Sequence, residues 1–331
     1  MNSRKLLINI LCSLFLSLTV SSCVTNSLIN SNSDNSNLDG NSIVSSNENE
    51  ELVYDYTEGL EFTLLQDGSA YELIGIGTAT GTRIVIPSTY KELPVTKIGD
   101  YAFASCSSLK SIIIPDSVTK IGDSAFGGCS SLKTIKIPNT VTKIGDSAFF
   151  KCSSLTSITI PNSVNKINWG TFQSCGSLKT IEIPNSVTSI DDRAFWECSS
   201  LVNITIPDSV TSIGHEIFYG CISLISVTIP DSINIIDGAT FYGCVSLKDI
   251  NIPNSVTKIE AYAFGCCYSL TSITIPNSVK KIGEYAFTDC NSLTKVYYIG
   301  TKEQWNSISV GDYNEELTNA TIIYNYVPEE E

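Results

Sequence analysis

The sequence predicts a solenoid, a rod of stacked repeat units with a parallel β-sheet on one face. Nine cysteines recur at intervals of 23 residues, and a phenylalanine lies three positions before each of them. An isoleucine-rich segment that ends in proline recurs with the same period. A fixed period between about 20 and 50 residues is typical of stacked units. The cysteines are Cys106, Cys129, Cys152, Cys175, Cys198, Cys221, Cys244, Cys267 and Cys290.

Each unit is expected to begin with a short strand. In the unit 109–131, Leu109, Ile112 and Ile114 share one face of an extended segment. Pro115 ends this strand, because proline has no N–H group for a β-ladder. Asp116 follows the proline, and in the other regular units Asp or Asn takes this place, where a short polar side chain can set a turn. The chain therefore reverses after each strand.

The second half of the unit is expected to return to the core. Val118 and Ile121 face inward on a second short extended piece, and the i, i+3 pair Phe126 and Cys129 fits one tight helical turn. One unit of 23 residues buries too little apolar surface to fold alone. Stability must therefore come from contacts between neighbouring units.

The cysteine column has three chemical interpretations. Metal ligands must converge on a point, whereas these thiols lie one unit apart in a line, and the chain has a single histidine. Disulfides between adjacent units are nearly reachable, but nine equivalent positions leave one thiol unpaired. We therefore predict free, buried thiols and no metal or cofactor. Cys266 lies off the column and is predicted to be the exposed, reactive thiol of the repeats.

The N-terminal region predicts export and lipid attachment. Arg4 and Lys5 precede an apolar run too short to span a bilayer, which indicates a signal peptide over 1–22. The junction before Cys23 resembles the lipobox of bacterial lipoproteins, which implies acylation of Cys23 and stable anchoring in the membrane. Ordinary signal cleavage and an uncleaved segment are the alternatives. Val24 after the cysteine favours the outer membrane of the cell envelope over inner-membrane retention.

The remaining boundaries follow from composition. Residues 23–58 are rich in Asn, Ser, Asp and Glu and predict a disordered, lipid-anchored tether. Residues 59–100 predict an N-terminal cap with a hairpin around Asp67 and Gly68, followed by an irregular first repeat with a five-residue insertion at 91–95. Regular repeats fill 101–298. Residues 299–331 predict a C-terminal cap and acidic tail, with a helix around 303–308 and a last strand at 320–326.

The repeat unit LxxIxIPxSVxxIGxxAFxxC resembles the BspA-like class of leucine-rich repeats, over roughly residues 61–326. The resemblance implies a β-rich leucine-rich repeat solenoid with a parallel sheet on one face, short extended and helical turns on the other, and a cap at each end. It also implies a surface-exposed binding role, with adhesion to host or neighbouring-cell molecules, and no particular ligand.

Two surfaces are candidates for binding a protein or glycan. The first is the outward column of the sheet, which is rich in hydroxyl groups; Thr also simply suits a solvated strand. The second is an aromatic ridge, whose rings could instead only cover gaps between units. The sheet-face candidates are Lys136, Thr159, Glu182, Thr205, Thr228, Asn251 and Thr274, and the ridge candidates are Phe150, Trp169, Trp196, Tyr219 and Tyr242.

Other functional classes fit the sequence less well. His215 is the only histidine and replaces an acidic residue of other units, with no orienting partner in the sequence. Glu182 and Asp249 lie three strands apart, about 14 Å, whereas glycosidase carboxylates need roughly 5 to 9.5 Å. The formal net charge of −14 disfavours nucleic acid. We therefore predict no enzyme activity; a structural spacer and a water-ordering Thr array remain as alternatives to adhesion.

Overall fold

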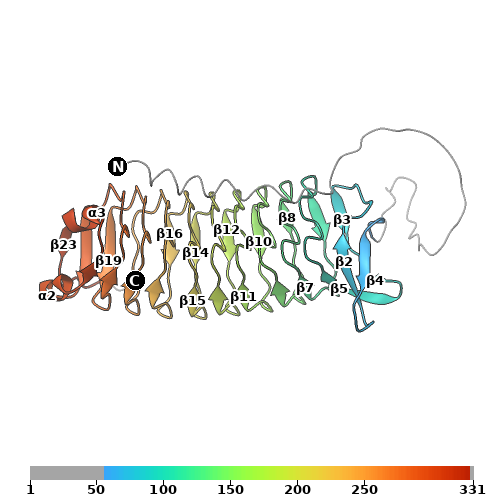
Figure 1. The fold of residues 1–331 in the computed structure, drawn as a ribbon, viewed down its shortest axis with the longest axis horizontal. Coiled ribbons are helices and arrows are strands. Elements are labelled where there is room, and N and C mark those ends of the chain that lie inside the picture. Colours follow the sequence, from blue (N-terminus) through green and yellow to red (C-terminus); the bar gives the residue numbers. More distant parts are fainter. Residues whose placement is uncertain (1–55, 329–331) are drawn as a thin grey trace, which may run out of the picture. The chain divides into compact units, whose positions relative to one another are not determined.

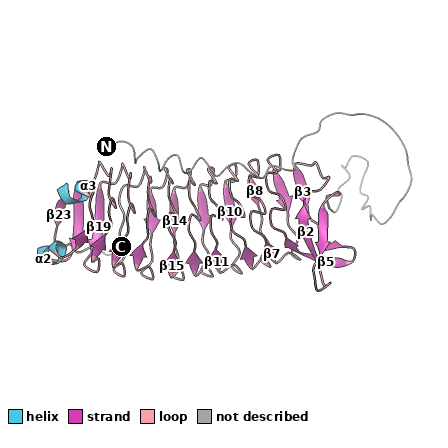
Figure 2. Ribbon diagram, viewed as in Figure 1, coloured by secondary structure: helices cyan, strands magenta, loops and turns pink. Residues whose placement is uncertain are grey.

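A computed structural model describes residues 56–328, all within the unit Asn47–Glu331. In this unit, short strands of successive coils lie side by side and pair in parallel (Figure 1). Strands and turns form nearly all of the described chain, and its two helices lie at the C-terminal end (Figure 2). The predicted β-rich solenoid with parallel strands is confirmed.

A hairpin closes the N-terminal end of the solenoid. β1 (Glu61–Leu64) pairs antiparallel with β2 (Tyr71–Gly75). Asp67 accepts hydrogen bonds from the backbone N–H and the hydroxyl of Ser69, at 3.0 and 2.7 Å, within the connecting turn. β2 then pairs in parallel with β5 (Leu93–Ile98). The predicted hairpin is therefore present, and it joins the stack of coils directly.

The predicted insertion at 91–95 forms part of a second hairpin. β4 (Thr89–Tyr90) pairs antiparallel with β5. Lys91 and Glu92 form the turn with φ values of 46° and 67°, as in the two-residue turns that match strand twist. The ring of Tyr90 stacks on Phe62 with 4.4 Å between ring centroids, so the insertion packs against the cap.

The first layer of the coils contains the strand that opens each repeat. Inward isoleucines of neighbouring strands are in register, as for Ile158 and Ile181. Ladders join β3 to β6, β8 to β10 and β12, β14 to β16, and β19 to β21 and β23 (Thr321–Ile323). Within the described chain none joins β6 to β8, β12 to β14 or β16 to β19. The strands are β3 (Arg83–Val85), β6 (Ser111–Ile113), β8 (Thr134–Ile135), β10 (Ser157–Thr159), β12 (Thr180–Glu182), β14 (Asn203–Thr205), β16 (Ser226–Thr228), β19 (Ser272–Pro276) and β21 (Lys295–Ile299).

The second layer contains two-residue strands built around the inward isoleucine that follows the valine. Its ladders join β1, β2, β5, β7 and β9, then β11, β13 and β15, then β17, β18, β20 and β22 (Ser309–Val310). Within the described residues it is therefore interrupted after β9 and after β15. The strands are β7 (Lys120–Ile121), β9 (Lys143–Ile144), β11 (Lys166–Ile167), β13 (Ser189–Ile190), β15 (Ser212–Ile213), β17 (Ile235–Ile236), β18 (Lys258–Ile259) and β20 (Lys281–Ile282).

The third side of each coil is a series of tight turns. The backbone N–H of Cys129 donates to the carbonyl of Phe126 at 3.1 Å, as the predicted i, i+3 turn requires. Ser124 and Gly128 have φ values of 50° and 77°, so a right-handed helix cannot continue through this segment. The predicted helical turn is thus a single turn. Between coils, the N–H of Phe126 donates to the carbonyl of Ala148 at 2.8 Å.

The repeated phenylalanines form one continuous stack in the core. Neighbouring ring centroids lie 5.1 to 5.7 Å apart, and the rings are nearly parallel. Such offset stacking adds to the free energy gained from burial. Each coil therefore depends on both of its neighbours. The rings are those of Phe103, Phe126, Phe149, Phe172, Phe195, Phe218, Phe241, Phe264 and Phe287.

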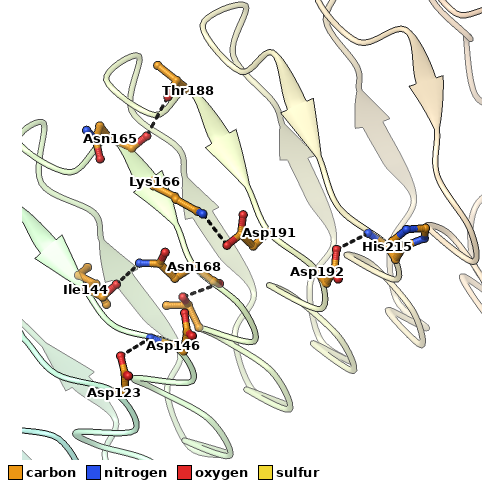
Figure 3. Close-up of polar contacts among 11 residues, drawn as sticks. Asp123, Ile144, Asp146, Asn165, Lys166, Asn168, Thr188, Asp191, Asp192 and His215 are labelled. Atoms are coloured by element: carbon orange, nitrogen blue, oxygen red, sulfur yellow. Dashed lines mark hydrogen bonds and ion pairs between the residues drawn. The ribbon is translucent and has the colours of Figure 1, made fainter.

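At the corner after the second strand, a carboxylate of one coil binds the backbone of the next. Asp123 Oδ1 accepts a hydrogen bond from the backbone N–H of Asp146 at 3.0 Å (Figure 3). A Cβ atom at Gly145 would lie 2.6 Å from the backbone nitrogen of Asp123 and closer still to its carboxylate. Only glycine therefore fits at this position. Asp192 Oδ1 accepts in the same way from the N–H of His215, at 2.8 Å (Figure 3).

The C-terminal cap contains α2 (Lys302–Asn306), β22 (Ser309–Val310), α3 (Glu315–Asn319) and β23 (Thr321–Ile323). Thr301 and Gln304 form a capping box at the start of α2. The buried Asn314 side chain accepts from the N–H of Phe287 at 3.0 Å and donates to the carbonyl of Gly283 at 2.9 Å. The Asn314 side chain thus makes the hydrogen bonds that the backbone of a following coil would make. The predicted helix and last strand are present, whereas β22 and α3 had no signal in the sequence.

Candidate functional site

The sheet-face candidates lie mostly on the surface. They alternate along the strands with buried isoleucines, because successive side chains of a strand point to opposite faces. The neighbouring outward column of small polar residues is exposed too, so a broad hydroxyl-rich face results. Lys136, Thr159, Glu182, Thr205, Thr228 and Asn251 are exposed, as are Thr134, Ser157, Thr180, Asn203, Ser226 and Asp249 of the neighbouring column.

Thr274 departs from the predicted column. Only 9% of this residue is exposed, so the expectation of a surface position is wrong. Its ladder partner on β21 is Tyr297, whose ring contacts the ring of Tyr326 with 4.6 Å between centroids. A small side chain beside two large rings is shielded from solvent. The exposed part of the predicted column therefore ends before β19.

The sheet face contains a hollow of about 540 Å³ where the ladder between β12 and β14 is interrupted. This volume lies in the usual range of ligand-binding pockets. Its lining combines exposed polar residues with buried isoleucines and a proline. We call it the sheet-face hollow; it is lined by Ile181, Glu182, Ile183, Asn185, Asn203, Ile204, Thr205, Ile206, Pro207, Asp208 and Thr228.

The charge inside the sheet-face hollow is one-sided. Glu182 and Asp208 are its ionisable residues, and no Lys, Arg or His belongs to the lining. Neither carboxylate forms an ion pair among the described residues. By contrast, Asp191 pairs with Lys166 of the second layer at 2.8 Å (Figure 3), and Glu216 pairs with Arg193 at 2.7 Å in the turns of the third side. The hollow thus offers uncompensated negative charge to a ligand.

Three residues of the predicted aromatic ridge come together. Trp196 and Tyr219 stack with 5.6 Å between ring centroids, and Tyr219 and Tyr242 with 4.9 Å. All three are half-buried. Because the rings stack on one another, their faces contact protein and mainly their edges face solvent. Tyr242 also covers Gly265 of the next coil, where a Cβ atom would lie 2.7 Å from its ring.

Phe150 and Trp169 do not join this stack. Phe150 contacts the ammonium group of Lys151 instead, 5.0 Å from the ring centroid. Trp169 is 39% exposed and has no ring partner among the described residues. It occupies the corner position where other coils carry Asp123 or Asp192. The ridge therefore begins at Trp196.

The structure extends the aromatic stack beyond the predicted residues. Tyr262 meets Tyr242 edge to face at 6.3 Å, stacks on Tyr285 at 4.9 Å, and Tyr285 stacks on Tyr313 at 4.2 Å. These tyrosines come from a different position of the repeat, five residues before the cysteine, and Tyr313 belongs to the C-terminal cap. The signal was a second aromatic position in the last units, two residues before Phe264 and Phe287.

The repeat cysteines form a column of buried free thiols, as predicted. From Cys129 onward each thiol donates to the carbonyl of the phenylalanine 26 residues earlier; Cys175 Sγ, for example, lies 3.1 Å from the Phe149 carbonyl oxygen. Burial raises the pKa of the Cys152, Cys175 and Cys198 thiols well above the ordinary value. Because the thiolate is the reactive form, these thiols are chemically inert in the folded protein.

Cys266 is the partly exposed thiol of the repeats. Its sulfur lies 3.8 Å from Asp289 Oδ2. Burial and a hydrogen bond with Cys266 raise the pKa of Tyr242, and the same thiol raises the pKa of Tyr268. The position off the column is as predicted, and the reactivity of Cys266 remains a prediction.

The structure corrects one detail of His215. Its Nδ1 atom lies 3.0 Å from Asp237 Oδ1, so the imidazole does have an orienting carboxylate. The side chain is 60% exposed, and no serine hydroxyl contacts the ring in the part of the chain that the structure describes. Among residues 56–328, no group of three or more His, Cys, Asp or Glu side chains could hold a metal ion. The expectation of a non-enzymatic protein stays a prediction.

The N-terminal predictions lie outside the described residues. They are the signal peptide 1–22, the acylated Cys23 and nearly all of the tether 23–58. Within residues 56–328, no helix has the length and hydropathy needed to cross a bilayer.

The fold and the repeat define a leucine-rich repeat protein. The model of the BspA type leucine rich repeat region matches residues 96–225 and 188–310, in six copies. These matches cover more than half of the chain, so the protein belongs to the BspA-type leucine-rich repeat family. The predicted resemblance is confirmed. A search of curated proteins finds no match.

Several solved structures are similar to this chain. A leucine rich cell surface protein from Faecalibacterium prausnitzii is 29% identical, with 79% of this chain and 98% of that one covered and a TM-score of 0.36. The leucine rich repeat protein TpLRR of T. pallidum is 26% identical, with 71% and 88% covered and a TM-score of 0.40. A leucine-rich repeat protein from Bacteroides ovatus is 25% identical, with 83% and 100% covered and a TM-score of 0.31.

Proposed function

We propose that this protein is a bacterial cell-surface lipoprotein that binds a protein or glycan of host or neighbouring cells through its sheet face. The observation that carries the proposal is the exposed, hydroxyl-rich double column with the sheet-face hollow at its middle. A parallel sheet holds these side chains at the fixed strand spacing of about 4.8 Å. Such a rigid array can bind without ordering itself first, which lowers the entropic cost of association.

The sheet face is preferred over the aromatic stack for a geometric reason. A glycan ring or an apolar side chain would pack best on an open aromatic face, but Trp196, Tyr219 and Tyr242 contact one another through their faces. The sheet-face side chains contact solvent instead. Stacking between coils also explains these three rings without a ligand.

The test is a screen of residues 24–331 against matrix proteins, glycans and whole cells. We expect Thr159→Lys/Thr205→Lys/Thr228→Lys to abolish binding of the partner found in the screen, because three charged side chains would block the face. Trp196→Ala/Tyr219→Ala/Tyr242→Ala is the matched triple substitution on the other surface and should bind normally if still folded. The opposite pattern would move the site to the aromatic stack.

A structural spacer is the alternative in the same experiment. If no partner is found and deletion of two internal units, 46 residues, changes only the length of the protein, the sheet face has no binding role.

Surface attachment has a separate test. Cys23→Ser should release the protein from membrane fractions, and retention there would exclude the lipid as the sole anchor.

A further inference from the structure

We infer that the sheet-face hollow is a recognition site for a basic side chain, Lys or Arg, of an extended polypeptide. This inference rests on the proposed function, since it names the ligand class for the same face. It adds Asn185, Asn203 and Asp208 to the predicted column, and it excludes neutral glycan as the main ligand of the hollow.

The site lies between strands β12 and β14 of the first layer. β8, β10 and β12 form one ladder, β14 and β16 form the next, and no ladder joins β12 to β14 in the described chain. The hollow of about 540 Å³ lies at this interruption and is lined from both sides of it. The two observations are independent, one from backbone pairing and one from the surface. Ladders are also missing between β6 and β8 and between β16 and β19 in the described chain, so the hollow itself, and not the missing ladder, distinguishes this site.

The lining favours a cation. Glu182 follows the middle isoleucine of β12, and Asp208 lies in the turn after Pro207, so the two carboxylates border different parts of the hollow. Neither has a basic partner among the described residues. Asn185, Asn203, Thr205 and Thr228 add oxygen acceptors. A guanidinium or ammonium group could donate to several of these atoms, and hydrogen bonds to charged groups are the stronger kind.

The apolar part of the lining favours a side chain with an aliphatic stem. Ile181, Ile183, Ile204 and Ile206 border the hollow, and each is at most 8% exposed. Lys and Arg place their methylene groups on apolar surface and keep the charged end at polar groups. No aromatic residue lines the hollow, so the ring face on which a sugar would stack is absent from the lining. A basic peptide therefore fits better than a glycan.

The test uses the full chain and two labelled decapeptides in which Thr alternates with Arg or with Gln. Alternation places all Arg side chains on one face of an extended peptide. Glu182→Gln/Asp208→Asn removes the two lining carboxylates. The matched control is Asp231→Asn/Asp249→Asn, which removes the same charge from the equivalent turn of the next coil and from the same sheet face, outside the lining. Unfolding curves verify that each variant is folded.

We expect the Arg decapeptide to bind the wild type at least tenfold more tightly than the Gln decapeptide. The lining variant should raise its dissociation constant at least tenfold, and the control variant less than twofold. Equal effects of both variants would reduce the binding to general electrostatic attraction and overturn the inference. It is also overturned if neither decapeptide binds, or if the neutral oligosaccharide cellohexaose displaces the Arg decapeptide.

The outcomes separate the inference from the proposed function. If the triple Thr→Lys variant loses its cellular partner but the lining variant keeps it, the sheet face binds and the hollow is not the basic-residue site. If both variants keep the partner, the sheet-face proposal itself fails.

Discussion

The regular coils and the two coils that pass through Asn168 and Asp237 differ at one corner. In regular coils, glycine follows the second strand, and the ladder to the preceding coil continues, as for Gly145 after β9. At Asn168 and Asp237 the second layer is interrupted. Asn168 Nδ2 donates to the carbonyl of Ile144 in place of a ladder bond (Figure 3). At these two corners a side chain replaces glycine, and the coil does not pair with the preceding one in the second layer.

The preceding coil decides which side chains are tolerated. In the preceding coil, the corner residue that faces Asn168 is Asp146, and the one that faces Asp237 is His215. A polar side chain therefore already lies where the Cβ atom of the next coil must fit. Asp191 also replaces glycine, yet its N–H donates to the carbonyl of Ile167 at 2.9 Å and the ladder continues. The corner residue before it is Trp169, which carries no carboxylate to bind the next coil. Glycine is therefore needed where the preceding coil carries Asp at this corner, and it is not needed in every coil.

Alkaline pH should have the largest effect on both kinds of coil, because the thiol column passes through all of them. The pKa of the buried thiols is raised in the folded state, whereas unfolded thiols ionise from about pH 8.5. The folded chain then binds more protons than the unfolded chain, so stability is full below about pH 8.5 and falls above it. Because several thiols ionise only in the unfolded chain, the free energy of unfolding should fall by several kcal/mol by about pH 10.

Urea unfolding between pH 7 and pH 10.5, with reductant present, measures this effect. Cys152→Ala/Cys175→Ala should show a shallower decline with pH, even though it starts from lower stability. A midpoint that stays constant through pH 10 would contradict the buried, protonated column.

Gly145→Ala should destabilise a regular corner strongly. The new methyl group would overlap the backbone and carboxylate of Asp123, and overpacking of this kind costs about 1–3 kcal/mol. Asp191→Ala is the matched control in the same position of an altered corner, and it should cost less than about 1 kcal/mol, the value of its surface ion pair with Lys166. Equal losses in urea unfolding would refute the role of the preceding carboxylate.

Cys175→Ala should cost about 0.5–1.5 kcal/mol, because it removes one of the two donors to the buried carbonyl of Phe149, which keeps the hydrogen bond from the Cys152 N–H. Cys175→Ser keeps a donor of similar size, so its loss should be smaller. The pair of variants separates the hydrogen bond from simple packing. A larger loss for Ser than for Ala in thermal or urea unfolding would show that the position requires an apolar side chain and not a donor.

Asn168→Gly should have the smallest effect on stability, less than about 1 kcal/mol, because it exchanges one hydrogen bond to Ile144 for another. Its structural effect should be clear: the glycine corner is restored, and β9 can pair with β11. Hydrogen exchange of the residue 168 amide reports this pairing, and we expect slower exchange than in the wild type. Unchanged exchange would place the cause of the interruption elsewhere, for example at the buried Thr171.

Local sequence patterns predict the repeat, the strand that ends at proline, the inward Ile, Phe and Cys columns and the position of the caps. These features follow from local rules: side-chain alternation in strands, the missing N–H of proline and the fixed period. Free thiols also followed, because residues one coil apart in a line cannot converge on a metal. The two-residue strands and the single turn around Phe126 repeat for the same reason in nearly every unit.

How neighbouring coils fit together follows from contacts that the sequence pattern does not show. The interruption between β12 and β14, the burial of Thr274 beside Tyr297 and the aromatic stack from Trp196 to Tyr313 depend on side chains 23 or more residues apart. Asn185 and Asp208 are predicted as turn residues from the sequence, and the structure places them in the lining of the sheet-face hollow. The repeat pattern determines which side chains each coil carries on its surface, but contacts between coils of different sequence determine where that surface forms a hollow.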